Sequence, residues 1–158
     1  MEITLARALK YKNRLVGKIA AVTEVIRNKN SVVKGTEKEV DINDLFKLRL
    51  KLVKNLIDLK TAINKANESI VSDIYNLSEI KSLMSIINSV DTTHGRSSKG
   101  GGYYGANPEP IEYESQMRFT DAEEMLSSGN KQIDQIQEKI DKHNHLITIN
   151  VEMLDEIY

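Results

Sequence analysis

Residues 94–105 concentrate the side chains of this chain that could bind an anion or a nucleobase. The segment reads HGRSSKGGGYYG and holds five of the eight glycines of the sequence, together with Arg96 and Lys99. No acidic residue occurs between Asp91 and Glu109, although the whole chain carries 22 Lys+Arg against 23 Asp+Glu. A segment of this composition can wrap an anion with its backbone N–H groups and place an aromatic ring on a base.

Each residue type in this segment has a distinct role in such a site. Glycine lets the backbone approach a phosphate closely, an arginine can grip the phosphate with two parallel hydrogen bonds, and a tyrosine ring can stack on a base. The segment is not a Walker A loop, because its lysine precedes the glycines. The predicted ligand-binding residues in the segment are Arg96, Ser97, Ser98, Lys99, Gly100, Gly101, Gly102, Tyr103 and Tyr104.

Cationic side chains elsewhere could add phosphate contacts. Arg7, Arg14 and Lys18 follow one another at helical spacing near the N-terminus, and Arg118 lies in a segment of alternating polarity. They could complete the site in the same or a neighbouring subunit, or simply form a solvated face. The alternative to ligand binding by the glycine-rich segment is that it is a flexible linker.

Other catalytic or metal chemistry has little support in the sequence. His143 and His145 stand two residues apart, so on a helix they point about 200° apart and cannot share a metal ion. Paired carboxylates such as Glu112 and Glu114 have no companion base, and no serine lies in a nucleophile elbow. We therefore expect no metal, no cofactor and no enzymatic activity. A hydrolase whose residues do not follow a known pattern stays open as a third alternative.

Length and composition limit the class of protein. A chain of 158 residues fits one helical domain, residues 1–158, with 94–110 as a glycine-rich basic and aromatic loop within it. A net charge of −1 argues against a DNA- or RNA-binding protein. Cysteine is absent, and neither a signal peptide nor an apolar run of membrane-spanning length is present. We expect a cytoplasmic protein without a membrane partner, in the host cytoplasm if a phage encodes it.

The apolar periodicity predicts the elements that must position these residues. Helices are expected over residues 3–29, from Asp41 or Asn43 to about 70, from an Asn76-to-Glu79 capping box to about 93, and from a Thr120-to-Glu123 capping box towards the C-terminus. Strand spacing is expected at 111–119, and a small hairpin is expected around Gly35, between 31–34 and 39–41. These two segments could pair. Gly129 interrupts the last apolar stripe, and it marks either a close helix crossing or a break.

These patterns predict a mostly α-helical fold, a bundle of three to four long antiparallel helices with a minor β-hairpin. The second helix is apolar on more than one side, which is typical of a helix that lies centrally in the fold or at a subunit interface. We therefore expect a homo-oligomer, a dimer or a tetramer.

The order of elements resembles the septicolysin-like family of helical proteins from bacteria and their phages. The matching pieces are residues 5–9 (LARAL), 30–35 (NSVVKG), 56–67 (LIDLKTAINKAN), 77–79 (LSE), 115–119 (SQMRF) and 131–137 (KQIDQIQ). Gln116 stands where the family pattern has an acidic residue, and the glycine-rich loop is longer and more cationic than in that pattern. Nothing in the sequence resembles a pore-forming segment.

The layout and the loop chemistry also resemble the small phage proteins that sequester cyclic-nucleotide immune signals, of the anti-CBASS type. This resemblance implies an oligomeric, non-enzymatic sponge that holds cyclic GMP-AMP or a similar cyclic dinucleotide between subunits. A different class of function remains open beside it: a helical oligomeric scaffold or protein-inhibitor module with no small-molecule ligand.

Overall fold

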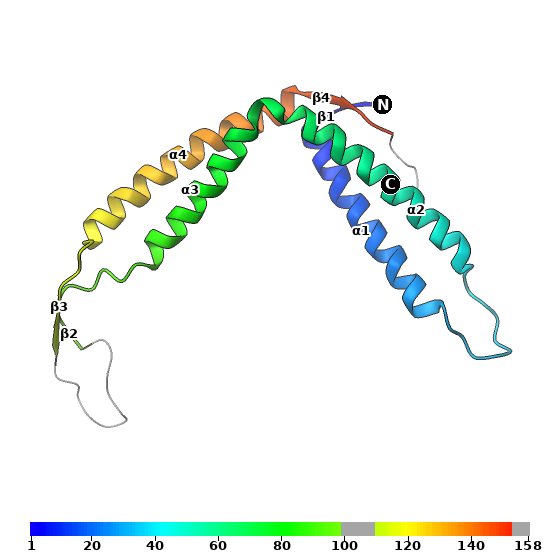
Figure 1. Ribbon diagram of the computed structural model, residues 1–158, viewed down its shortest axis with the longest axis horizontal. Coiled ribbons are helices and arrows are strands. Elements are labelled where there is room, and N and C mark those ends of the chain that lie inside the picture. The colour runs from blue at the N-terminus through cyan, green and yellow to red at the C-terminus, as the bar shows by residue number, and fades with distance from the viewer. Residues whose placement is uncertain (99–109, 153–158) are drawn as a thin grey trace. The chain divides into compact units, whose positions relative to one another are not determined.

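The computed structural model describes residues 1–98 and 110–152, and within them the chain is mostly helical, with four α-helices and two short antiparallel strand pairs (Figure 1). The elements are β1 (Glu2–Thr4), α1 (Leu5–Lys29), α2 (Ile42–Ala66), a short 3-10 turn η1 (Glu68–Ile70), α3 (Val71–Ser89), β2 (Gly95–Ser97), β3 (Ile111–Tyr113), α4 (Phe119–Leu146) and β4 (Thr148–Asn150). The predicted mostly helical fold is confirmed.

The chain divides into two compact units, which are described separately. Unit 1 comprises Met1–Val71 and Ile140–Tyr158, and unit 2 comprises Ser72–Lys139. The expected single domain and the expected oligomer stay predictions.

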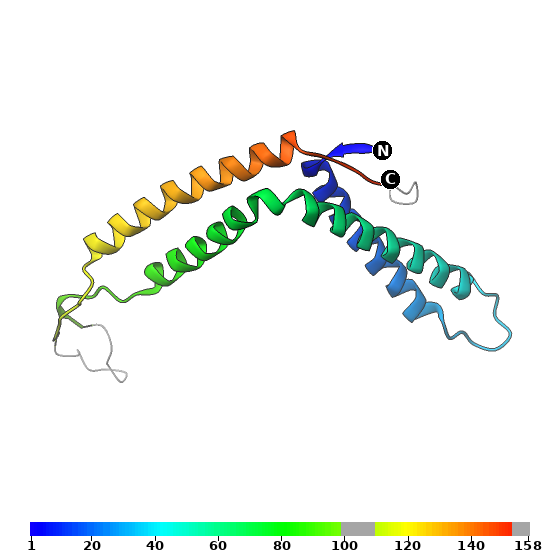
Figure 2. The same cartoon turned by 45° about the horizontal axis from the view of Figure 1, so that its top comes forward.

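The first two helices form the body of unit 1 and lie side by side as a hairpin (Figure 2). The Thr4 hydroxyl caps α1 by accepting the Arg7 N–H, and the Asp41 carboxylate caps α2 by accepting the N–H groups of Asn43 and Asp44. Their facing stripes bury a continuous core. Its members are Ile3, Leu5, Ala8, Tyr11, Leu15, Val22, Ile26, Leu52, Leu59, Ile63 and Val151.

A strand pair joins the beginning of the chain to residues 148–150 within unit 1. β1 and β4 are antiparallel, with Ile3 opposite Ile149. The Met1 ammonium donates a hydrogen bond to the Val151 carbonyl at 2.9 Å, and the Leu5 N–H donates to the Ile147 carbonyl at 2.9 Å. The last helix was expected to run on towards the C-terminus, and this expectation is wrong. The helix ends at Leu146 because the following residues form β4.

The third and fourth helices form unit 2 and run antiparallel. Met84 of α3 lies against Gly129 of α4, and Lys139 at the end of the unit forms an ion pair of 2.6 Å with Asp73 at its beginning. Of the two alternatives for Gly129, the break is wrong, because α4 continues through this residue; the glycine gives room to the Met84 side chain. The Asn76-to-Glu79 segment does not start a helix, because α3 already begins at Val71 directly after η1.

The predicted small hairpin around Gly35 is wrong. Residues 31–41 form no strand, and Gly35 has a φ of +92° in the turn between α1 and α2. The segment at 111–119 forms a strand only over β3, and its partner is β2 and not the 31–41 segment. The alternation beyond Tyr113 gives way to a bend before α4.

The predicted capping box of the last helix lies two residues out of register. α4 begins at Phe119, so Thr120 is already inside the helix. The Asp121 carboxylate instead accepts the Arg118 N–H at 3.0 Å, which is the reciprocal half of a capping box centred on Arg118. The pattern T-x-x-E at 120–123 therefore does not by itself fix where the helix begins, because Arg118 and Asp121 can form the same kind of contact two residues earlier.

Candidate functional site

The two ends of the glycine-rich segment meet in the short ladder of β2 and β3. Gly95 lies opposite Tyr113, Arg96 opposite Glu112, and Ser97 opposite Ile111. Gly95 has a φ of +79°, a backbone conformation that suits glycine and allows the chain to enter β2. Next to the ladder, the Ser115 N–H donates a hydrogen bond to His94 Nδ1 at 3.3 Å. The segment between Ser97 and Ile111 is therefore closed at its base.

Arg96 has an exposed side chain on β2, and its position in the ladder is the main electrostatic feature of the candidate site. Residues directly opposite in an antiparallel pair extend to the same face of the sheet, so Arg96 shares its face with Glu112, which is also exposed. A carboxylate in this position competes with any anion for the guanidinium. The run without acidic residues in the sequence therefore does not translate into an acid-free base of the loop.

The remaining predicted residues of the segment divide into two groups. Ser97 is half-buried on β2 and Ser98 is exposed just after it. The other predicted ligand-binding residues, Lys99, Gly100, Gly101, Gly102, Tyr103 and Tyr104, lie outside the described residues. The structure thus describes the base of the predicted site, and ligand binding by all of these residues stays a prediction.

The arginines predicted to support the site belong to different units. Arg118 is exposed and immediately precedes α4 in unit 2, where its own N–H is occupied by Asp121. Arg7 and Arg14 are exposed on α1 in unit 1. The predicted set of site residues is therefore shared between the two units.

The histidines take part in local backbone contacts. His143 is half-buried, with its Nε2 at 3.1 Å from the Ala66 carbonyl, and the Nδ1 of His145 lies 2.7 Å from the Asp141 carbonyl one turn earlier. Within residues 1–98 and 110–152, no group of three His, Cys, Asp or Glu side chains gathers in a geometry that could hold a metal ion.

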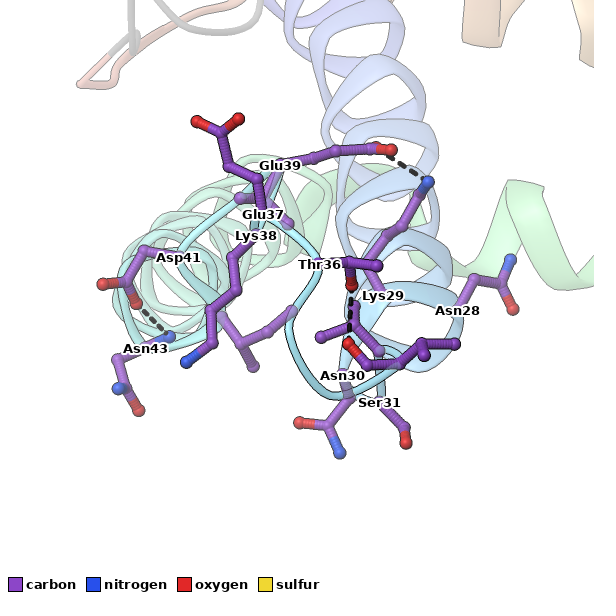
Figure 3. Close-up of a pocket in the computed structure, with 14 residues that line it drawn as sticks. Asn28, Lys29, Asn30, Ser31, Thr36, Glu37, Lys38, Glu39, Asp41 and Asn43 are labelled. Atoms are coloured by element: carbon purple, nitrogen blue, oxygen red, sulfur yellow. Dashed lines mark hydrogen bonds and ion pairs between the residues drawn. The ribbon is translucent and has the colours of Figure 1, made fainter.

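The sequence analysis missed a hollow between the end of α1 and the start of α2. This cavity of about 870 Å³ is formed by residues 28–33 and 36–43 (Figure 3). Lys29 and Glu39 form an ion pair of 2.7 Å across it, and the Thr36 hydroxyl donates to the Val33 carbonyl. The only sequence signal was the polar run around Gly35, which we interpreted as a hairpin.

The chemistry of this hollow is that of a polar surface turn. Hydrogen bonding and charge from Lys29 hold the pKa of the Glu39 carboxyl below its ordinary value of 4.5. Asp41 is occupied as the cap of α2. These groups are used to order the turn, so the hollow offers no arrangement of catalytic residues.

A second, smaller hollow of about 230 Å³ lies against α2 in unit 1, where Asn55, Asp58 and Leu59 face residues 150–152. Asn55 is 7% exposed, and both polar atoms of its side chain form hydrogen bonds. Its Oδ1 accepts the Tyr11 hydroxyl at 3.0 Å and its Nδ2 donates to the Glu152 carbonyl at 2.8 Å. This polar chain attaches residues 151–152 to the helical hairpin.

No helix among the described residues combines the length and the apolar character that crossing a bilayer requires. Comparisons with protein-family models, with curated proteins and with solved structures give no significant match to this chain.

Proposed function

We propose that this protein is a non-enzymatic nucleotide-binding protein that captures a cyclic dinucleotide with the loop at residues 94–110 and retains it intact. In this proposal it acts as a sponge for a signal of the cyclic GMP-AMP type, as a phage protein that counters bacterial defence would. The ligand lies between subunits of a homo-oligomer. The single observation that supports this proposal best is the ladder of β2 and β3 at the base of the loop.

The ladder matters because ordering a flexible segment opposes binding. Fixing a residue costs about 1–2 kcal/mol of conformational entropy, so a loop with free ends binds weakly. Here Ser97 and Ile111 are already paired in register, and loop closure is achieved before any ligand arrives. Bringing the two ends of the loop together therefore adds no further cost to binding.

The chemistry of the loop favours a ligand with more than one phosphate. Arg96 shares its face of the ladder with Glu112, so a single phosphate would have to compete with the Glu112 carboxylate for the guanidinium. A ligand that brings two phosphates can engage Arg96, Lys99 and the glycine amides together, and it can lay its bases on Tyr103 or Tyr104. A cyclic dinucleotide has these features.

The proposal is tested by equilibrium titration of the full chain with cyclic GMP-AMP, with ATP and with inorganic phosphate. We expect saturable binding of the cyclic dinucleotide, weaker binding of ATP and none of phosphate. Arg96→Ala combined with Tyr104→Ala should abolish it, whereas Lys81→Ala, which removes an exposed cation of α3 in the same unit, should not. Affinity that is unchanged in the double variant contradicts the proposal, and turnover of the ligand would make the protein an enzyme.

The second candidate function, a helical scaffold or protein-inhibitor module, is favoured by a different observation. Large apolar side chains lie exposed along two helices, with Leu50 of α2 65% exposed and Tyr75 of α3 66% exposed. Such side chains in rows mark a surface that another protein covers. In this function deletion of residues 98–106 would leave partner binding unchanged, whereas it would abolish nucleotide capture.

A further inference from the structure

The two units carry opposite charge, which the net charge of −1 conceals. Unit 1 holds 16 Lys and Arg against 12 Asp and Glu, a formal charge of +4, and unit 2 holds 6 against 11, a formal charge of −5. The excess in unit 1 lies largely on its helices. α2 alone has six basic residues and two acidic ones. Each half of the chain is thus electrostatically complementary to the other half of a second copy.

α2 has two apolar faces, and the second one is exposed. Its core face packs on α1 through Leu52, Leu59 and Ile63. At about 100° per residue, Phe46, Leu50 and Ile57 fall within about 40° of one another on the opposite side. Their exposed fractions are 48%, 65% and 58%. We call this row, with the half-buried Val53 within it, the α2 stripe.

Lysines flank the α2 stripe on both sides. Lys54 lies about 70° from its centre on one side and Lys60 about 50° on the other, and both side chains are exposed. A basic amphipathic surface of this kind suits an acidic partner that also presents apolar side chains.

Unit 2 is such a partner, because it is both acidic and incompletely covered. Only Ile87 and Ala122 are buried apolar side chains among its described residues, whereas the core of unit 1 has eleven. Tyr75, Leu83 and Ile86 of α3 are 66%, 47% and 58% exposed and lie within about 80° of one another. Two helices with so little buried surface need further helices to complete a core.

The exposed row of α3 also contains an acidic residue. Glu79 is exposed and falls within about 20° of Ile86 on the helix. The exposed acids Glu123, Asp134 and Glu138 of α4 turn to the other side of the antiparallel pair, where Lys131 lies beside them.

We infer that the α2 stripe of one copy docks on unit 2 of a second copy of this chain. The apolar row on α2 covers the exposed row on α3, and the flanking lysines lie beside Glu79, which belongs to that row. If two copies exchange this contact reciprocally, both stripes are covered at once and the assembly closes as a dimer. A membrane would suit the basic α2 surface but would leave the exposed face of the acidic unit 2 uncovered, so the second copy accounts for more of the surface.

This inference locates the contact of the homo-oligomer in the proposed function, but it does not need a nucleotide. The association is therefore measured without ligand, by analytical ultracentrifugation of the full chain at low and at high salt. We expect a concentration-dependent dimer that high salt weakens. A monomeric protein would contradict the position of the ligand between subunits, whereas nucleotide binding by the loop is measured separately in the titration. A dimer that binds no nucleotide would contradict the proposed function alone.

Two charge-reversal variants and their mixture make the test specific. One variant carries Lys54→Glu and Lys60→Glu on α2, and the other carries Glu79→Lys on α3. Each alone should associate about tenfold or more weakly than the wild type, because like charges then face each other. An equimolar mixture should restore the dimer as a heterodimer, since each variant then meets the opposite charge.

The matched control reverses two exposed lysines of α1, Lys10→Glu and Lys18→Glu, which lie off the α2 stripe. This control should keep most of the association of the wild type, and circular dichroism should show that all variants remain helical. A wild type that stays monomeric overturns the inference, and so does a mixture that does not re-associate. Monomeric protein that binds phosphatidylserine vesicles through Lys54 and Lys60 also overturns it, in favour of a membrane surface.

Discussion

Gly129 of α4 lies directly against the side chain of Met84 of α3. A Cβ atom added at Gly129 would overlap Met84 Sδ and would stand 2.5 Å from its Cε and 3.2 Å from its Cγ. The Met84 side chain thus occupies the space that a Cβ at position 129 would take, and a substitution there requires the flexible end of Met84 to move. Gly17 of α1 is the opposite case, because an added Cβ there meets nothing within 4 Å.

Alanine substitution should therefore have effects of different size at these two glycines. Gly17→Ala is expected to raise the free energy of unfolding by about 0.5–1 kcal/mol, because alanine is the better helix former. Gly129→Ala gains the same propensity but forces the flexible end of the Met84 side chain to move, so a smaller gain is expected. Urea unfolding measures both, and in a Met84→Ala background the two glycines should give equal gains. If Gly129→Ala stabilises the wild type as much as Gly17→Ala does, Met84 does not occupy the space beside Gly129.

The polar chain from Tyr11 through Asn55 to Glu152 should stabilise unit 1. Asn55→Ala removes the hydrogen bonds that Asn55 forms with the buried Tyr11 hydroxyl and with the Glu152 carbonyl, and we expect a loss of about 1–3 kcal/mol in the free energy of unfolding. Asn64→Ala, an exposed position of the same helix, is the matched control and should change stability by less than about 0.5 kcal/mol. Equal effects of the two substitutions would show that the hydrogen bonds of Asn55 contribute nothing to the stability of unit 1.

The ion pair of Lys29 and Glu39 should be visible in an acid titration. The pKa of Glu39 is lowered in the folded protein, so the contribution of this pair is present above the unfolded pKa and is lost as the pH falls through the folded one. Both side chains are exposed, and we expect little effect on overall stability. Carbon-detected NMR should show that the pKa of Glu39 is lower in the wild type than in the Lys29→Ala variant. A Glu39 titration that Lys29→Ala does not shift contradicts the pair.

Glu112 should modulate nucleotide binding through Arg96. Because the two exposed side chains share a face of the ladder, Glu112→Gln removes the carboxylate that competes for the guanidinium. We expect affinity for cyclic GMP-AMP to rise by about fivefold or more and its salt dependence to steepen. Glu114→Gln, an exposed acid just beyond β3, is the control. If both variants bind equally, Arg96 does not contact the ligand.

The long helices could be predicted from the sequence because their apolar stripes recur over many turns. The expected helix over 3–29 corresponds to α1, and Asp41 was correctly named as a possible cap of α2. Such stripes average over local irregularities, so a few polar interruptions do not hide them.

The short elements could not be predicted, because their partners are distant in the sequence. β1 pairs with β4 across almost the whole chain, and nothing in Glu2–Thr4 alone indicates it. Ser31–Lys34 has strand-like residues, yet it lacks a partner strand and forms part of a turn. For the same reason Glu112 was missed as a neighbour of Arg96: only the register of β2 on β3 brings the two together.

The central claim is that the loop at 94–110 captures a cyclic dinucleotide and keeps it intact. Native mass spectrometry of the full chain mixed with cyclic GMP-AMP tests it most directly, because the mass of the complex reports stoichiometry and ligand integrity at once. The account predicts an oligomer that carries intact ligand, and its absence in the Arg96→Ala, Tyr104→Ala variant. An oligomer that retains no nucleotide under any condition, or one that carries a cleaved product, would contradict it.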